Sequence, residues 1–268
     1  MKREYKIGIS GVGMVGGAVN NYFQNNNVFP FLYDPVKNIG SEDDLNKAEV
    51  VFICVPTPYL KDGPGFELSY VRESCKNLKG EKIVVIKSTV LPGTTESLQK
   101  EFPQHKFLFN PEFLSEDTAD HDMKFPDRQI VGYTKKSKDV ARDILNILSR
   151  SPYEKIMVST EAEMVKYFNN NFNAVKVIFA NQIYDLCQAL NINYDNVMKS
   201  AAKSKFIRTK DHLKVWHKKF RGYGGKCLPK DIRAIIQMAD SLGVDLKLYK
   251  VVEEINDKLM KDQGIYND

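Results

Sequence analysis

The first 160 residues alternate between short apolar runs and amphipathic stretches. Seven runs rich in Val, Ile and Phe predict strands buried on both faces of a sheet. They are Tyr5–Ser10, Val28–Tyr33, Val50–Val55, Lys82–Lys87, Lys106–Phe109, Gln129–Gly132 and Lys155–Val158. Helical periodicity falls between several of them, at Val15–Asn25, Leu68–Leu78, Thr94–Glu101 and Lys138–Ser149. Repeated strand–helix–strand units predict an α/β fold with a doubly wound, mostly parallel sheet of the Rossmann type.

The pattern becomes helical after residue 158. Thr160 and Glu163 fit a capping box, with Thr160 as N-cap and Glu163 at the third helical position. A helical pattern then continues to about Leu190, roughly 30 residues or ~45 Å, which suggests a connecting or dimer-forming element. Three further helices are predicted at Asn193–Ser204, Pro229–Leu242 and Asp245–Lys261. We therefore predict a Rossmann-type domain over residues 1–158 and an all-helical domain over residues 159–268.

Composition narrows the class of protein. Hydrophobic residues make up 43% and charged residues 27% of the chain, a balance typical of globular proteins. Apolar runs such as Val50–Val55 are far shorter than the roughly 20 residues of a membrane span, and residues 1–6 lack the apolar stretch of a signal peptide. The cysteines have neither zinc-type spacing nor the density of a disulfide scaffold, so we expect no metal and a reducing, cytoplasmic location. They are Cys54, Cys75, Cys187 and Cys227.

Positive charge is concentrated in one segment. Residues 199–233 contain 12 basic residues and only two acidic ones, although the formal net charge of the whole chain is just +5. Such a local excess calls for an anionic partner, either nucleic acid or a phosphorylated small molecule.

A glycine-rich turn directly follows the first predicted strand. It reads Gly11-Val12-Gly13-Met14-Val15-Gly16 and opens a predicted helix. The first glycine permits a tight turn, the second lets the backbone approach a pyrophosphate, and the third lets helix and strand pack closely. Asp34 lies 23 residues after Gly11, where a carboxylate binds a ribose 2′-hydroxyl and repels a 2′-phosphate. The motif predicts NAD as cofactor; the alternative is a glycine-rich turn in another α/β fold.

A second glycine-rich segment carries a candidate nucleophile. It reads Gly222-Tyr223-Gly224-Gly225-Lys226-Cys227-Leu228-Pro229-Lys230-Asp231. Pro229 suits the first turn of the following helix, so Cys227 is expected at a helix N-terminus between two lysines. These surroundings lower a thiol pKa from ~8.5 toward ~7 or below, and the glycines admit a substrate. The alternative is an accidental surface thiol.

Further candidate residues lie on the long helix and in loops that follow strands. Lys166 and Asn170 are four apart and so share one helix face, although a solvated polar face would look the same. In doubly wound sheets, ligands bind beyond the carboxyl ends of the strands. The loops at residues 55–58, 87–94 and 110–116 are all expected there.

Taken together and in this order, these segments resemble the UDP-glucose 6-dehydrogenase family, within the UDP-glucose/GDP-mannose dehydrogenase superfamily. The resemblance runs from about Tyr5 to Asn256. Its most specific pieces are residues 222–231, Lys-Ser-Thr-Val-Leu-Pro-Gly-Thr at 87–94, Asn-Pro-Glu-Phe-Leu at 110–114, Pro-Asp-Arg at 126–128, and the helical set Glu163, Lys166 and Asn170.

The resemblance implies a four-electron oxidation of a nucleotide sugar, most simply UDP-glucose, at C6. NAD removes a first hydride, the Cys227 thiolate adds to the aldehyde, and a second hydride transfer leaves a thioester that water hydrolyses. Catalytic roles are implied for Cys227, Lys166, Asn170, Asp231 and Glu112. Cofactor contacts are implied for Gly11, Gly13, Val15, Gly16, Asp34, Thr57, Thr89 and Glu116. Substrate contacts are implied for Lys230, Arg208, Gly224 and Gly225.

The chain departs from the family at its C-terminal end, where members continue into a third, nucleotide-gripping domain. We therefore expect a short form in which the basic segment from Lys199 to Lys219 binds the diphosphate, and in which Arg208 matches the arginine that reaches a neighbouring subunit. The expected partners are a nucleotide sugar and a second copy through the long helix, without nucleic acid or membrane.

Three alternatives stay open. A β-hydroxyacid-type dehydrogenase acting on a smaller anion would not need Cys227. An NAD-binding remnant would be inactive. A nucleic-acid protein would use the basic segment, but this segment lacks a regular pattern of stacking aromatics.

Overall fold

The computed structural model describes residues 4–63, 65–207, 211–217, 219–225 and 227–265. The chain divides into two compact units. The first comprises Met1–Pro58 and Phe66–Lys166, and the second comprises Tyr59–Gly65 and Tyr167–Asp268. The expected domain boundary at residue 158 stays a prediction.

An eight-stranded sheet forms the centre of the first unit. Its order is β10-β9-β8-β7-β4-β1-β2-β3, and its strands are β1 (Ile7–Ser10), β2 (Phe31–Asp34), β3 (Ile39–Gly40), β4 (Val50–Ile53), β7 (Ile83–Ile86), β8 (Lys106–Phe109), β9 (Arg128–Tyr133) and β10 (Tyr153–Val158). The five central strands β8-β7-β4-β1-β2 run parallel. Two pairings are antiparallel, β3 on β2 and β9 on β8, while β10 runs parallel to β9. The predicted fold class, a mostly parallel Rossmann-type sheet followed by a long helix, is confirmed.

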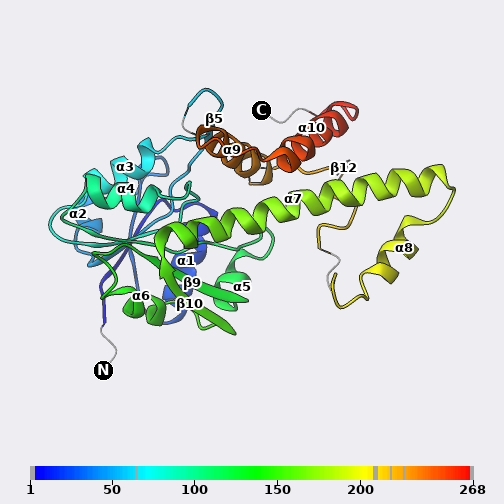
Figure 1. Cartoon of the computed structure of the whole chain (residues 1–268). Coiled ribbons are helices and arrows are strands. Elements are labelled where there is room, and N and C mark those ends of the chain that lie inside the picture. The colour runs from blue at the N-terminus through cyan, green and yellow to red at the C-terminus, as the bar shows by residue number, and fades with distance from the viewer. Residues whose placement is uncertain (1–3, 64, 208–210, 218, 226, 266–268) are drawn as a thin grey trace. The chain divides into compact units, whose positions relative to one another are not determined.

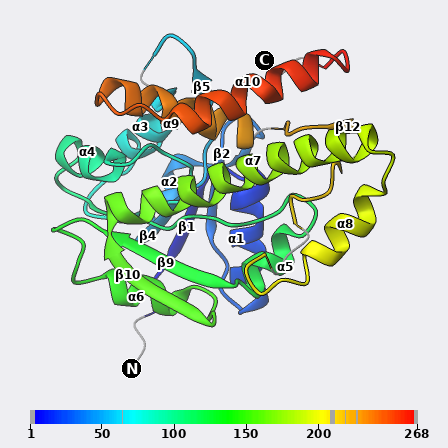
Figure 2. The ribbon, with the colours of Figure 1, turned by 45° about the vertical axis from the view of Figure 1, so that its right-hand side comes forward.

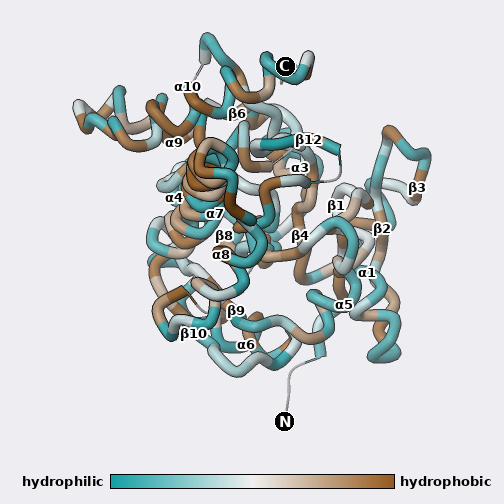
Figure 3. Tube along the Cα trace, turned by 90° about the vertical axis from the view of Figure 1, so that its right-hand side faces the viewer, coloured by the Kyte–Doolittle hydropathy of each residue, from teal (hydrophilic) through white to brown (hydrophobic). Residues whose placement is uncertain are grey.

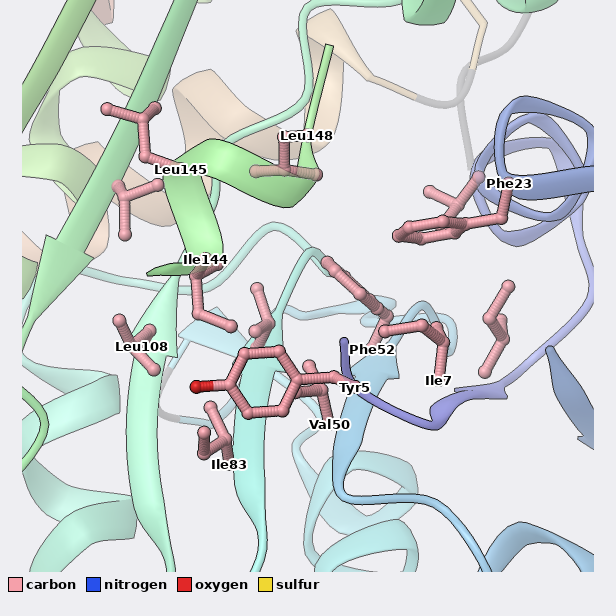
Figure 4. Packing of buried hydrophobic residues seen from close by; sticks show 14 of the residues in the cluster. Tyr5, Ile7, Phe23, Val50, Phe52, Ile83, Leu108, Ile144, Leu145 and Leu148 are labelled. Carbon is pink, nitrogen blue, oxygen red and sulfur yellow. The ribbon is translucent and has the colours of Figure 1, made fainter. Parts of the chain in front are cut away.

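Helices cover both faces of this sheet (Figure 2). They are α1 (Met14–Asn25), α2 (Glu42–Leu45), α3 (Ser69–Lys76), α4 (Thr94–Glu101), α5 (Ala119–Lys124) and α6 (Ala141–Ile147). One apolar core joins the sheet to α1, α5 and α6, and the other joins it to α2, α3, α4 and the start of the next helix. Figure 4 shows the first core, where Phe23 of α1 and Ile144 of α6 approach the side chains of the central strands.

The buried strands explain why sequence patterns located them. Every residue of β1, β4 and β7 is buried, so these strands have no polar face. Consecutive side chains alternate between the two cores: Val50 and Phe52 lie in one, and Val51 and Ile53 in the other. In Figure 3 the tube at β4 is accordingly coloured brown, the hydrophobic end of the scale. Burial on both sides gives continuous Val, Ile and Phe runs rather than alternation.

The second unit is mainly helical. It contains most of α7 (Ser159–Ala189), then α8 (Tyr194–Ala201), α9 (Leu228–Ser241) and α10 (Lys247–Lys261), with short strands β5 (Tyr59–Leu60), β6 (Gly65–Phe66, which ends in the first unit), β11 (Trp216–His217) and β12 (Phe220–Arg221). The 31-residue α7 is one uninterrupted helix (Figure 1). The side chains of α7, α9 and α10 share one apolar cluster, and those of α7 and α8 form part of another. In the part of the chain that the structure describes, no helix combines the length and apolar character that a membrane span requires.

Two local expectations are wrong. Thr160 is not the N-cap of the long helix, because α7 already begins at Ser159, directly after β10. The Glu163 side chain reaches the segment before α4 rather than its own helix start. The expectation of an all-helical domain over residues 159–268 misses β11 and β12, which have two residues each and so no period to detect.

Candidate active site

The glycine-rich turn between β1 and α1 has the backbone geometry that its sequence predicts. Gly11 has a φ of +85°, a region that favours glycine, and a Cβ atom there would lie 2.9 Å from the backbone of Cys54. A Cβ atom on Gly16 would lie only 1.9 Å from the carbonyl oxygen of Gly11. Gly11 therefore permits the turn, and Gly16 lets α1 lie close against it.

Gly13 leaves open space at the start of α1. A Cβ atom on Gly13 would meet no described atom within 4 Å, and no described side chain caps this helix end. The first N–H groups of a helix have no partner within the helix and attract phosphate. The turn therefore fits a pyrophosphate, with Val15 in the first turn of the helix.

Asp34 braces the same turn from the end of β2. One of its carboxylate oxygens accepts the N–H of Val12 at 2.8 Å, and the other accepts the N–H of Lys37 at 3.1 Å. The Lys37 ammonium in turn donates to the carbonyl oxygen of Val12 at 2.6 Å. Each carboxylate oxygen keeps acceptor capacity after one hydrogen bond, so Asp34 can still bind a ribose hydroxyl. The turn and Asp34 together fit a dinucleotide.

Thr57 and Thr89, both expected near the cofactor, contact each other. The Thr57 hydroxyl donates to the carbonyl oxygen of Thr89 at 2.7 Å and joins the loop after β4 to the loop after β7. Glu116, the remaining expected cofactor contact, is exposed in the turn before α5.

Lys166 and Glu112 form a buried ion pair within the first unit. The Lys166 ammonium donates to a Glu112 carboxylate oxygen at 2.6 Å and to the Glu112 carbonyl oxygen at 2.8 Å. Both side chains are less than a tenth exposed. Burial alone raises the pKa of the Glu112 carboxyl, but the charge and hydrogen bond of Lys166, the N–H of Leu114 and the charge of Lys87 together outweigh burial, and the net shift is downward. The two residues, 54 positions apart, are brought together as one acid–base pair.

A second buried lysine stands beside this pair and was given no role by sequence reasoning. Lys87 at the end of β7 donates to the side-chain oxygen of Asn110 at 2.6 Å, and Asn110 donates to Gln129 and to the carbonyl oxygen of Ile130. Burial lowers the pKa of the Lys87 ammonium, which also senses the charges of Glu112 and Lys166. The sequence does contain a signal that could have identified this pair: Lys87 and Asn110 are polar residues that directly follow two buried strands.

Glu163 holds the start of α4 from the first turns of α7. One carboxylate oxygen accepts the N–H of Gly93 at 2.6 Å, and the other accepts the N–H and the hydroxyl of Thr95 at 2.8 and 2.6 Å. Burial nevertheless raises the pKa of Glu163 to about 7. Glu163 thereby fixes the end of the 87–94 loop.

The second unit contains another polar group of expected site residues. The Asn170 amide on α7 donates to one carboxylate oxygen of Asp231 on α9 at 2.6 Å. The Lys230 ammonium donates to the other oxygen at 2.6 Å. Asp231 is fully buried and Asn170 nearly so. An amide and an ammonium thus compensate the burial of this carboxylate.

Cys227 occupies the N-cap of α9, with Pro229 in the first turn, as the sequence predicts. Its thiol-bearing side chain is exposed, whereas Cys75 and Cys187 are buried. Burial raises the thiol pKa of Cys54 and of Cys75 to about 12, as expected of unreactive cysteines. Cys227 is therefore the accessible cysteine at a helix start.

The glycines before Cys227 differ in their surroundings. A Cβ atom on Gly224 would press on the Phe220 ring at 3.2 Å, whereas Gly225, with a φ of +78°, faces open space. Arg208 and Lys226 lie outside the described residues.

Comparison with known proteins gives matches along most of the chain. Residues 37–149 match the NAD-binding domain, and residues 160–258 the central domain, of the UDP-glucose/GDP-mannose dehydrogenase family. The UDP-glucose 6-dehydrogenase of Rickettsia bellii is 32% identical over 224 residues, which cover 80% of this chain and 50% of the relative. That of Rhizobium meliloti is 32% identical over 246 residues, 83% of this chain and 54% of the relative. The chain thus spans about half the length of these curated relatives.

Solved structures agree with the fold. A UDP-glucose dehydrogenase from Pyrobaculum islandicum superposes with a TM-score of 0.80 at 25% identity, covering 98% of this chain and 72% of the other. A 3-hydroxyisobutyrate dehydrogenase from Mycobacterium tuberculosis superposes with a TM-score of 0.75 at 13% identity, covering 99% of this chain and 97% of the other. The second likeness concerns the fold alone.

Proposed function

Because this chain belongs to the UDP-glucose/GDP-mannose dehydrogenase family and contains its NAD-binding domain, we propose that it oxidises the C6 hydroxymethyl group of a nucleotide sugar, most simply UDP-glucose, to a carboxylate. NAD, when bound, accepts a hydride in each of the two oxidations. The observation that carries the proposal is Cys227, an exposed thiol at the N-terminus of α9 with the buried Asp231 one turn further along.

The chain's own groups then have distinct tasks. The Cys227 sulfur adds to the aldehyde carbon, and the oxygen takes up a proton to give a thiohemiacetal. Loss of the second hydride and of the hydroxyl proton leaves a thioester on sulfur. Water then attacks the thioester carbon, the C–S bond breaks, and the carboxylate and the thiol are released. One sugar alcohol, two NAD and one water thus give one uronate, two NADH and three protons.

The buried pairs supply acid–base and electrostatic help. Lys166 and Asn170 carry N–H donors on one side of α7 and stabilise oxyanions, where a single well-placed donor is worth ~10²-fold or more in rate. Glu112 is kept ionised by Lys166 and serves as the base that activates water for thioester hydrolysis. Asp231 holds a water or takes a proton beside Asn170.

Substrate contacts, assembly and location complete the proposal. Lys230, Gly224 and Gly225 border Cys227 in sequence, and the basic segment Lys199–Lys219, with Arg208, binds the diphosphate through its positive charge. A second copy of the chain docks on α7, which exposes large apolar side chains. A reactive thiol stays reduced in the cytoplasm, where we expect the protein to act.

Counting NADH against substrate tests the proposal. The chain is incubated with a panel of UDP- and GDP-sugars, and the wild type is compared with Cys227→Ser and with Cys187→Ser as a buried-cysteine control. We expect two NADH per sugar in the wild type and the control, and no uronate from Cys227→Ser. One NADH per substrate, independent of Cys227, would instead identify a β-hydroxyacid-type dehydrogenase. NAD binding without turnover of any sugar nucleotide would identify an inactive form.

A further inference from the structure

Two side-chain amides of the C-terminal helical segment pair with the backbone that leads to Cys227. Asn256 of α10 accepts the N–H of Tyr223 at 2.8 Å and donates to the carbonyl oxygen of the same residue at 2.9 Å. Gln263, two residues after α10, accepts the N–H of Arg221 at 2.8 Å and donates to its carbonyl oxygen at 3.0 Å. Each amide thus makes both hydrogen bonds of a backbone pair, as a neighbouring strand would. We call these four hydrogen bonds the amide clasp.

The geometry of the clasp depends on the backbone at Gly222 and on the positions of Asn256 and Gln263. Arg221 and Tyr223 are two residues apart and flank a bend at Gly222, while Asn256 lies in α10 and Gln263 lies just after its end. Gly222 lies between the clasped residues with a φ of +94°, and a Cβ atom there would lie 2.7 Å from the Asn256 side-chain oxygen. The clasp therefore also explains why position 222 is a glycine.

Further contacts hold Arg221 and Tyr223. The Arg221 guanidinium donates to the Asn181 side-chain oxygen at 3.0 Å and pairs with Asp185 at 2.6 Å, both on α7. The Tyr223 hydroxyl donates to Glu253 at 2.7 Å, and Tyr223 is 2% exposed. Residues 221–223 are thus fixed to α7 and to α10 within the second unit, immediately before two glycines.

The clasp determines where the loop carrying Cys227 starts. Cys227 follows Tyr223 by four residues, and its other side is fixed because its carbonyl oxygen accepts the N–H of Asp231 in α9. Gly224 and Gly225 lie between the two fixed points and resist bending less than other residues do. The Cys227 thiol is therefore held from two sides, by the clasp before the two glycines and by α9 after them.

We infer that Asn256 and Gln263 are positioning residues that hold the Cys227 thiol where it captures the aldehyde, an inference that rests on the proposed function. Neither side chain needs to touch substrate. Their effect passes through the backbone of residues 221 and 223. If the clasp opens, the first oxidation continues while capture of the aldehyde fails.

The test replaces each amide nitrogen by oxygen. Asn256→Asp and Gln263→Glu keep the shape but place a carboxylate oxygen against a carbonyl oxygen. Asn196→Asp on the exposed face of α8 is the matched control. NADH, uronate and hydrazone are measured with UDP-glucose in the presence of a hydrazine that traps aldehyde. Gln263 is only half-buried, so Gln263→Glu keeps the test valid if Asn256→Asp does not fold.

We expect each clasp variant to form uronate at least ~10-fold more slowly, to release aldehyde as hydrazone, and to approach one NADH per sugar, with an unchanged KM for NAD. The control should keep two NADH per sugar. A merely structural role would lower NADH and uronate together at a ratio of two, and this result would overturn the inference.

A second readout does not depend on turnover. The rate at which iodoacetamide alkylates Cys227 is followed from pH 5 to pH 10 by peptide mass spectrometry. We expect the midpoint to rise by about one pH unit in the clasp variants, because the thiol leaves the helix N-terminus. Unchanged profiles would contradict the clasp inference even if the wild type oxidises no nucleotide sugar, whereas that absence of turnover alone contradicts only the proposed function.

Discussion

Single residues of the candidate site act in pairs that the chain order does not reveal. Lys166 meets Glu112 across 54 positions, and Asn170 meets Asp231 across 61. The sequence could nominate each of these four residues, through helical spacing, a loop after a strand and the resemblance to a family. The sequence could not predict which of these residues contact each other, because tertiary packing determines the pairs. Asn256, whose two side-chain hydrogen bonds both join the backbone of Tyr223, gave no signal in the sequence.

Three glycines at one turn give a prediction that separates folding from binding. We expect Gly16→Ala to lower the free energy of unfolding by ~2 kcal/mol or more, because its Cβ atom would meet the Gly11 carbonyl oxygen at 1.9 Å. Gly13→Ala should fold normally but bind NAD at least ~10-fold more weakly, because its methyl group occupies the space that suits the pyrophosphate. Gly17→Ala, also in open space, is the control. Denaturant unfolding and NAD titration check both expectations, and normal NAD affinity in Gly13→Ala would contradict them.

Buried strands of the main sheet and helices of seven or more residues were predictable, whereas shorter helices and two-residue strands were not. The bounds of α4 and β8 agree with the sequence prediction, and α7 ends within one residue of it. In contrast, α2, α5 and the two-residue strands are too short to show a period. The capping box at the start of α7 failed for another reason: Glu163 has better donors at the start of α4 than at its own helix end.

The hydrogen bonds of Glu163 on α7 to the start of α4 make the free energy of unfolding depend on pH. The pKa of Glu163 in the folded protein is about 7, against 4.5 for an ordinary glutamate, so the folded state binds the proton more tightly. This contribution is fully present below pH 4.5 and is lost as the pH rises through 7. Relative to Glu163→Gln, the wild type should therefore lose up to about 3 kcal/mol of unfolding free energy over that interval. Denaturant unfolding at several pH values checks the slope, and parallel curves would contradict it.

At the scale of the whole molecule, fold class was the most predictable property because a doubly wound sheet repeats one unit. The antiparallel β9 was less predictable, since strand direction leaves no trace in the composition of a buried strand.

The surface of α7 carries an apolar stripe. Its exposed large apolar side chains recur at intervals of four and seven and lie within about 80° around the helix. They are Met164, Phe168, Phe172, Phe179 and Leu186.

This apolar stripe leads to a prediction about assembly. If a second copy covers the stripe, Phe172→Asp combined with Phe179→Asp should weaken self-association by ~100-fold or more, because charges would enter an apolar contact. Sedimentation velocity over a range of concentrations measures the change. Phe29→Asp removes an even more exposed aromatic residue outside α7 and serves as control. A wild type that stays monomeric at high concentration would contradict the prediction.

The hydrogen bond from the N–H of Asp231 to the carbonyl oxygen of Cys227 has a consequence for variation of this protein. The Cys227 sulfur and the Asp231 carboxylate lie one turn apart at the start of the same helix, α9. The helical backbone therefore sets the distance between them. Lengthening or shortening the chain before the clasp at Arg221 would leave the sulfur and the carboxylate in the same relative position as long as the clasp stays closed. A change in the size of the accepted sugar would therefore have to come from neighbouring side chains, with the distance between nucleophile and acid left intact.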